Sequence, residues 1–144
     1  MNEVVKKIIL LLIITFSFSL SVNAQEIENK EMGKIYFLRS TGFVTSASTF
    51  KIFIDGKFVC KLNNKKYSIH EVPVGKHKCS VQIEGKKSKE SAEKFEIEVE
   101  AGKITYVQII FKMGFFINNV LCEGINENSA AQRMKEMKED TECL

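Results

Sequence analysis

Four cysteines and two histidines are the residues of this 144-residue chain whose types could support covalent or metal chemistry. They are Cys60, Cys79, Cys122, Cys143, His70 and His77. No two cysteines form a Cys-x-x-Cys pair, the spacing typical of zinc ribbons and thioredoxin-like redox sites. We therefore expect no metal site and no cofactor, and we assign the cysteines to disulfides or to the core.

Four cysteines allow three disulfide pairings. Cys60 and Cys79 fall on the apolar faces of predicted strands, where small thiols are also common as plain core residues. A Cys122–Cys143 bond would tie the last predicted helix to the sheet across 21 residues, which stabilises by about 3 kcal/mol in the chain-entropy model. We expect this bond first, and Cys60–Cys79 second.

Neither histidine stands in a context that indicates catalysis. His77 follows a Pro-x-Gly-Lys turn and begins a core strand, so we expect a structural ring whose nitrogen is hydrogen-bonded. A metal site needs three or four supported ligands, which His70, His77 and Glu71 do not complete. No serine stands in a recognisable nucleophile–base–orienter set. We expect a protein that is not an enzyme.

Tyr36, Arg39 and Tyr67 are the strongest candidates for ligand-binding residues. Aromatic rings beside an arginine can form a recognition patch, and tyrosine adds a polar hydroxyl. Such a site would use an open sheet face or the loops around Thr45 and residues 63–67. The alternative is that the rings fill the core and that Arg39 pairs with an acidic neighbour.

Short strands separated by turn residues must position these side chains. Apolar alternation predicts strands at 35–38, 50–54, 58–62, 67–72, 77–83, 95–100 and 104–111, with one more within 115–122. The long strand 104–111 is expected at the centre of a sheet. Turns about every 8–12 residues favour a mainly β fold, a single Ig-like β-sandwich of about seven or eight strands.

A C-terminal α-helix is predicted at about 127–140. Asn126 or Asn128 can cap it, and Ala130, Met134 and Met137 then share one face. We expect that face to pack on the sandwich, whereas an exposed stripe would indicate a helix that docks a partner.

The Asp55-Gly56 pair predicts a β-hairpin. The apolar residues before the turn end at Ile52 and Ile54, and those after it begin with Phe58. Because side chains alternate with a period of two, only a loop of odd length places both apolar sets in the core. We predict a three-residue loop that pairs Ile52 with Phe58, a type I turn in which Gly56 is in the left-handed region and forms a bulge.

The first 24 residues are typical of a secretory signal peptide. Lys6 and Lys7 precede the apolar run 8–16, and Val22-Asn23-Ala24 forms a small-x-Ala cleavage pattern. The stretch is shorter than the ~20 residues of a spanning helix, so an uncleaved anchor is the weaker alternative. We predict cleavage after Ala24, a flexible leader at 25–33 and a domain at 34–144, with no stable membrane anchor after cleavage.

Removal of residues 1–24 takes away two lysines and one glutamate, which leaves 120 residues with a charge of +2. Residues 51–94 carry a net charge of +6 and residues 115–144 a net charge of −3. A basic face can meet an anionic lipid or cell-wall polymer. The alternative is that these lysines only cover the solvated faces and edges of strands, which gives the same distribution of charge. We expect no nucleic-acid partner, because the lysines lack interleaved aromatic residues.

Several motifs in order resemble one family. They are Lys34-Ile-Tyr-Phe-Leu-Arg39, Lys51-Ile-Phe-Ile-Asp-Gly-Lys57, Lys66-Tyr67, Val72-Pro-Val-Gly-Lys-His77, Ala101-Gly-Lys103 with Tyr106, and Val120-Leu121. Together they resemble the DUF2846 family of bacterial envelope proteins, over about residues 33–140. The middle of the chain also resembles PEGA domains and other prealbumin-like sandwiches. Members are often lipoproteins, and this chain departs from them because its first cysteine is Cys60.

The resemblance implies export and a sandwich fold, and it brings no activity or site residues with it. We expect an exported, non-enzymatic module at the bacterial envelope, periplasmic or secreted, that binds a small ligand or glycan. The alternative is a module that docks an envelope protein through an edge strand or the C-terminal helix. A minor third reading is a factor with redox-labile thiols.

Overall fold

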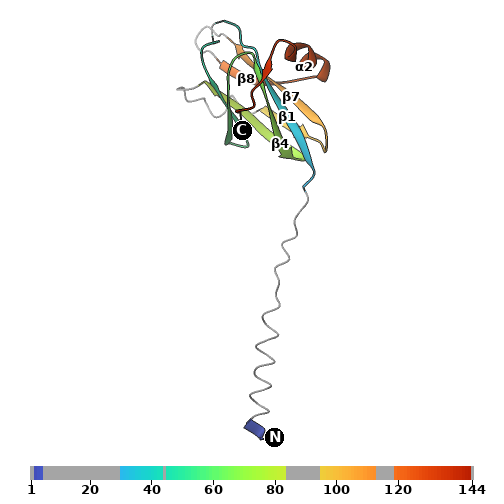
Figure 1. Cartoon of the computed structure of the whole chain (residues 1–144). Coiled ribbons are helices and arrows are strands. Elements are labelled where there is room, and N and C mark those ends of the chain that lie inside the picture. The colour runs from blue at the N-terminus through green and yellow to red at the C-terminus, as the bar shows by residue number, and fades with distance from the viewer. Residues whose placement is uncertain (1, 5–29, 44, 84–94, 113–118, 144) are drawn as a thin grey trace.

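Alternating apolar residues build two β-sheets whose inner faces meet in one core. The computed structural model describes residues 2–4, 30–43, 45–83, 95–112 and 119–143. The five-stranded sheet has the order β8 (Asn119–Ile125), β7 (Ile104–Lys112), β1 (Met32–Arg39), β4 (Lys66–Pro73) and β9 (Lys138–Glu139). The four-stranded sheet has the order β3 (Lys57–Leu62), β2 (Phe50–Ile54), β5 (Gly75–Ile83) and β6 (Phe95–Val99). Figure 1 shows the two layers and helix α2 (Glu127–Met134). The predicted mainly β sandwich with a C-terminal helix is confirmed.

Every predicted strand between Ile35 and Phe111 is present, with ends that differ by a few residues. The fully buried aromatic rings of the core are Phe37 and Phe50, one from each sheet. The predicted strand 104–111 is β7, an interior strand paired on both sides as expected, and the middle strand of the sheet is β1. It pairs in parallel with β7 and antiparallel with β4.

The folded domain begins slightly earlier than predicted. Strand β1 begins at Met32, inside the predicted leader 25–33, because the Met32 carbonyl accepts the Gly102 N–H at 2.9 Å and Met32 pairs with Pro73. The predicted signal peptide lies almost wholly outside the described residues. Within the described part of the chain, no helix has the length and apolar character needed to span a membrane.

The β2–β3 hairpin corrects the predicted register. Asp55 and Gly56 both have positive φ, 52° and 76°, which makes a two-residue loop. Ile52 pairs with Cys60 rather than with Phe58, and the register shifts just after Ile52. The extra residue that we expected in a three-residue loop therefore lies in strand β3, where it forms a bulge. Cys60 and Leu62 still reach the core, whereas Phe58 is 52% exposed.

The C-terminal helix is shorter than the predicted 127–140. Asn126 caps it as expected, since its side chain accepts the Ser129 N–H at 2.9 Å. The helix ends at Met134, because the following residues pair with the edge of β4 instead. Asp140 donates its N–H to the Tyr67 carbonyl at 2.8 Å, and its carboxylate lies 3.1 Å from Lys66 Nζ.

This return along β4 corrects the disulfide prediction. Cys143 arrives beside β3 and bonds Cys60, with the two Cα atoms 4.9 Å apart. The bond joins neither of the expected pairs, Cys122–Cys143 and Cys60–Cys79, and Cys79 and Cys122 lie outside it. Short-range spacing favoured the predicted pairs, whereas the fold brings together cysteines that are 83 residues apart.

We predict that loss of this disulfide strongly destabilises the domain. Closing an 83-residue loop stabilises by about 4.5 kcal/mol in the chain-entropy model. Cys143→Ser should lower the free energy of unfolding by that order in urea denaturation. A dithiol reductant should bring the wild type to the same midpoint and leave Cys143→Ser unchanged. Equal sensitivity of both proteins to the reductant would contradict the bond.

Candidate functional site

All three tyrosines of the chain lie together on the outer face of the five-stranded sheet. They are Tyr36 on β1, Tyr67 on β4 and Tyr106 on β7. The rings of Tyr36 and Tyr67 are nearly parallel, with an interplanar angle of 8° and centroids 6.2 Å apart. The rings of Tyr36 and Tyr106 meet edge to face at 5.5 Å. We call these three residues the tyrosine row.

Strand register explains the row. Tyr36 stands directly beside Tyr106 in the parallel β1–β7 pair, and Tyr67 pairs with the residue two positions after Tyr36. Side chains two residues apart in a strand share a face, which places Tyr67 on the diagonal from Tyr36. The core-facing neighbours, Ile35 and Phe37, are fully buried. The tyrosines themselves are partly exposed.

Helix α2 covers one end of the same outer face. It contacts β1, and Leu38 of that strand and Ala130 of the helix are both fully buried. Neither residue belongs to the central core between the sheets. Ala130 of the predicted helix face therefore packs on the sheet, Met134 is half-buried, and Met137 lies beyond the end of the helix. Figure 1 shows α2 lying over β1 and β7.

Acidic residues of the C-terminal segment border the row. The Tyr67 hydroxyl donates to a Glu139 carboxylate oxygen at 3.4 Å. Burial and then the charge of Glu139 raise the pKa of Tyr67, and burial and then the charge of Glu127 raise the pKa of Tyr106. Both hydroxyls therefore stay protonated at neutral pH and can donate hydrogen bonds.

Arg39, predicted as a ligand-binding residue, lies inside the protein. Its side chain is fully buried, and its guanidinium carbon lies 3.6 Å from the ring centroid of Phe50. It donates to the Leu62 carbonyl at 2.5 Å, to the Thr45 carbonyl at 2.7 Å and to Thr41 Oγ1 at 3.3 Å. Burial lowers its pKa to about 10, so it remains charged at neutral pH. Arg39 and Thr45 hold the loop after β1 against β3 and are not available to a ligand.

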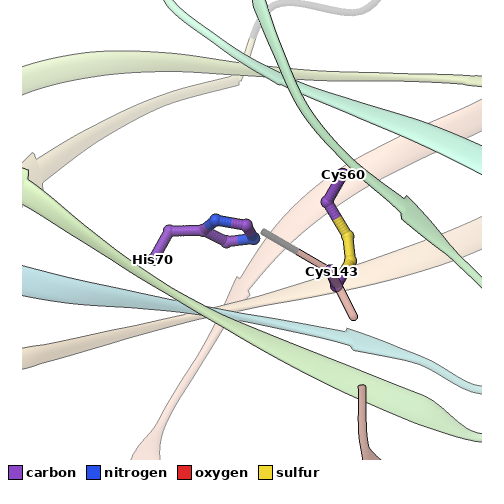
Figure 2. Close-up of side chains that lie close together, drawn as sticks. All are labelled: Cys60, His70 and Cys143. Atoms are coloured by element: carbon purple, nitrogen blue, oxygen red, sulfur yellow. A yellow bond between two sulfur atoms is a disulfide. The ribbon is translucent and has the colours of Figure 1, made fainter. Parts of the chain in front are cut away.

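A groove lined by both histidines opens between β3 and β4. Its volume is about 410 Å³, and Cys143 forms part of its wall. His70 Nε2 lies 3.0 Å from Ser68 Oγ, and the ring meets Phe37 edge to face. The His70 imidazole also points toward Cys60 and Cys143 (Figure 2), and the ligand-type atoms of these three residues all lie within 4.8 Å of one another. Burial lowers the pKa of His70, which favours the neutral ring.

His77 has the structural role that its position predicts. Its Nδ1 lies 2.7 Å from an Asp55 carboxylate oxygen, and its Nε2 lies 2.7 Å from the Pro73 carbonyl. Two acceptors suit an imidazolium that donates from both nitrogens. Burial alone would lower the pKa of His77, but the two hydrogen bonds and the charge of Asp55 together raise it. The ring ties the β2–β3 turn to the start of β5.

Sequence reasoning found two members of the tyrosine row and missed Tyr106. The alternation of 104–111 carries the signal, because Val107 and Ile109 face the core and Tyr106 must then face outward. The convergence of His70 with two cysteines has no comparable local signal, because it depends on the path of the C-terminal segment.

Residues 29–125 match the family model DUF2846, described as a protein of unknown function. The chain belongs to the DUF2846 family. The DUF2846 match contains the whole tyrosine row, His70 and Cys60, and it ends before α2, β9 and Cys143. No curated protein and no solved structure matches this chain.

We predict that Arg39→Ala costs about 3–5 kcal/mol of unfolding free energy, because it opens a cavity and leaves two buried carbonyls without a donor. Chemical denaturation measures the loss. Arg133→Ala, on the exposed surface of α2, is the matched control and should change the value by less than about 0.5 kcal/mol. Equal effects of the two variants would refute a structural role for Arg39.

We predict that the His77–Asp55 pair stabilises the domain most at mildly acidic pH. The folded-state pKa of His77 is raised above its ordinary value of 6.5, so its contribution is full below pH 6.5 and is lost as pH rises through the folded-state pKa. The pKa of Asp55 is lowered below 3.8, because its hydrogen bonds and the charge of His77 outweigh burial. Its contribution is therefore full above pH 3.8 and is lost as pH falls further.

Urea denaturation of wild type and His77→Gln across pH 4 to 9 isolates this effect, since His70 titrates in both proteins. The difference in unfolding free energy should be largest below pH 6.5 and should shrink toward pH 9. A difference that grows with rising pH would show that the pair is not charged as the contacts imply.

Proposed function

We propose that this chain is an exported, non-enzymatic module that binds a glycan of the bacterial cell envelope on its tyrosine row. The observation that carries the proposal is the contact of three partly exposed tyrosine rings across three neighbouring strands. Rings of this kind offer flat apolar faces to the C–H groups of a sugar ring, and their hydroxyls offer hydrogen bonds to its hydroxyl groups. Periplasmic or secreted location after cleavage at Ala24 is part of the proposal.

Polar groups around the row suit a hydroxyl-rich ligand. Lys34 and Glu71 face outward beside Tyr36 and form an ion pair, with 3.4 Å between Lys34 Nζ and Glu71 Oε1. Glu139 already accepts a hydrogen bond from Tyr67 and can accept another from a sugar hydroxyl. A sheet built on a packed core holds such groups in fixed positions, which lowers the entropy cost of binding.

Two further features support export. The Cys60–Cys143 disulfide is the type of bond that persists in oxidising compartments such as the periplasm. The first 24 residues have the order of a signal peptide, with lysines, an apolar run and a small-x-Ala site. Both features support the proposed location at the cell envelope.

The second candidate function is the docking of an envelope protein through edge strand β3. Phe58 on that strand is 52% exposed and meets Phe53 edge to face at 5.9 Å. Edge strands with exposed aromatic side chains can pair with a strand of a partner. The C-terminal helix is the weaker docking element, because its Ala130 face is already buried on the sheet.

The chain has no tryptophan, so its intrinsic fluorescence comes from the tyrosine row itself. We predict that titration with a fragment of peptidoglycan or of an envelope polysaccharide changes this fluorescence. Tyr36→Ala, in the middle of the row, should weaken binding by about tenfold or more, as for a central contact residue, whereas Tyr36→Phe keeps the ring and most of the affinity. Calorimetry provides the affinity of each variant.

Phe58→Ala is the matched control, because it removes an exposed ring from the other sheet. It should bind glycan like the wild type. A partner protein whose capture is lost in Phe58→Ala and kept in Tyr36→Ala would overturn the glycan proposal and favour docking through β3.

A further inference from the structure

Three segments that are distant in the sequence bring two sulfur atoms and an imidazole together between the edges of the two sheets. Cys60 comes from β3, His70 from β4 and Cys143 from the residues after β9. Their ligand-type atoms lie within 4.8 Å of one another, and the imidazole points toward the two sulfurs (Figure 2). Cys60 is 1% exposed and Cys143 is 6% exposed.

Strand register and backbone hydrogen bonds hold this arrangement. Cys60 pairs with Ile52, and His70 pairs with Ile35, two residues that face the core. Cys143 is positioned by its N–H, which donates to the Asp140 carbonyl at 3.2 Å. The sheets therefore present two of the groups independently of the disulfide, and the C-terminal segment presents the third.

We propose that the reduced form of this group, with Cys60, Cys143 and His70 as ligands, binds a zinc ion. In the structure the two cysteines are bonded as a disulfide. A dithiol reductant supplies two electrons and two protons, so the S–S bond breaks and two thiols form while the dithiol closes to its own disulfide. Zinc then forms two Zn–S bonds and one Zn–N bond, and the two thiol protons leave to solvent.

The geometry suits zinc. With Zn–S bonds of about 2.3 Å and a Zn–N bond of about 2.0 Å, tetrahedral ligand atoms lie about 3.4–3.8 Å apart. The observed limit of 4.8 Å is close to this separation, and the sulfurs move apart once their bond is broken. Two thiolates and an imidazole are a soft to borderline donor set, which excludes calcium and magnesium as the preferred ions.

The surroundings leave an open coordination position. Ser68 is fully buried, and its Oγ lies 3.0 Å from His70 Nε2, so this contact supports the ring only where the other nitrogen, Nδ1, binds the ion. Phe37 packs edge to face on the same ring. Cys143 and His70 line the groove of about 410 Å³, so an ion and a fourth ligand, water, can enter from solvent. Three protein ligands with a water in the fourth position match the coordination of open zinc sites.

The test uses the full chain, reduced with a dithiol that is then removed without air, and titrated with zinc against a chromogenic chelator. We expect one zinc per chain in the reduced protein and none at this group in the oxidised protein. Cobalt in place of zinc should give the thiolate-to-metal charge-transfer band and the visible bands of a tetrahedral site. This spectrum reports on the ligands directly and needs no biological activity.

Variants identify the ligands. Cys143→Ser should abolish the tight site, and His70→Gln should weaken it by more than about tenfold. The matched controls are Cys122→Ser and His77→Gln, which each remove a residue of the same type outside the cluster and should bind like the wild type. All proteins are compared in the reduced state, where none has the disulfide, and circular dichroism verifies that each is folded.

The proposal is overturned if the reduced, folded protein takes up no zinc, or if it takes up copper(I) but not zinc. It is also overturned if His70→Gln binds as tightly as His77→Gln. If Cys122→Ser loses zinc binding and Cys143→Ser keeps it, the zinc site lies elsewhere in the protein and the proposal is overturned. None of these results depends on glycan binding, which variants of the tyrosine row test separately.

Discussion

Strand β1 is hydrogen-bonded on both sides, and the register of these two pairings determines where the rest of the molecule places its chemistry. The parallel pairing with β7 puts Tyr106 beside Tyr36, and the antiparallel pairing with β4 puts Tyr67 on the diagonal. The same alternation sends Arg39 to the inner face. A shift of one residue would exchange the two faces and would bury the tyrosines in place of the core residues.

The buried guanidinium of Arg39 shows how this register extends into the loops. Its donors end on the carbonyls of Leu62 and Thr45, so one side chain links β1, β3 and the segment between β1 and β2. A buried cation is costly unless its donors are satisfied, and here three oxygens and the face of Phe50 satisfy them. The segment around Thr45, where a ligand site was expected, is instead held in the folded core by Arg39.

The C-terminal segment covers the edge of the five-stranded sheet at β4. It leaves α2, pairs with β4 and delivers Cys143 to Cys60, so the sheets are joined by a covalent bond where their edges approach. This path also places the sulfurs beside His70 at the groove. A long-range disulfide and a potential metal ligand set thus have one physical origin, the covering of an exposed strand edge.

The sequence by itself determined the strands, the mainly β sandwich, a helix cap at Asn126 or Asn128 and the family, because alternation and capping are local properties of the chain. It also identified Tyr36 and Tyr67, but it could not show that Tyr106 completes their row. Only the tertiary structure decided the Cys60–Cys143 bond, the burial of Arg39, the end of the helix at Met134 and the position of the bulge in β3. Each depends on which edges and carbonyls are brought near by strands far apart in the chain, and local spacing contains no information on those distances.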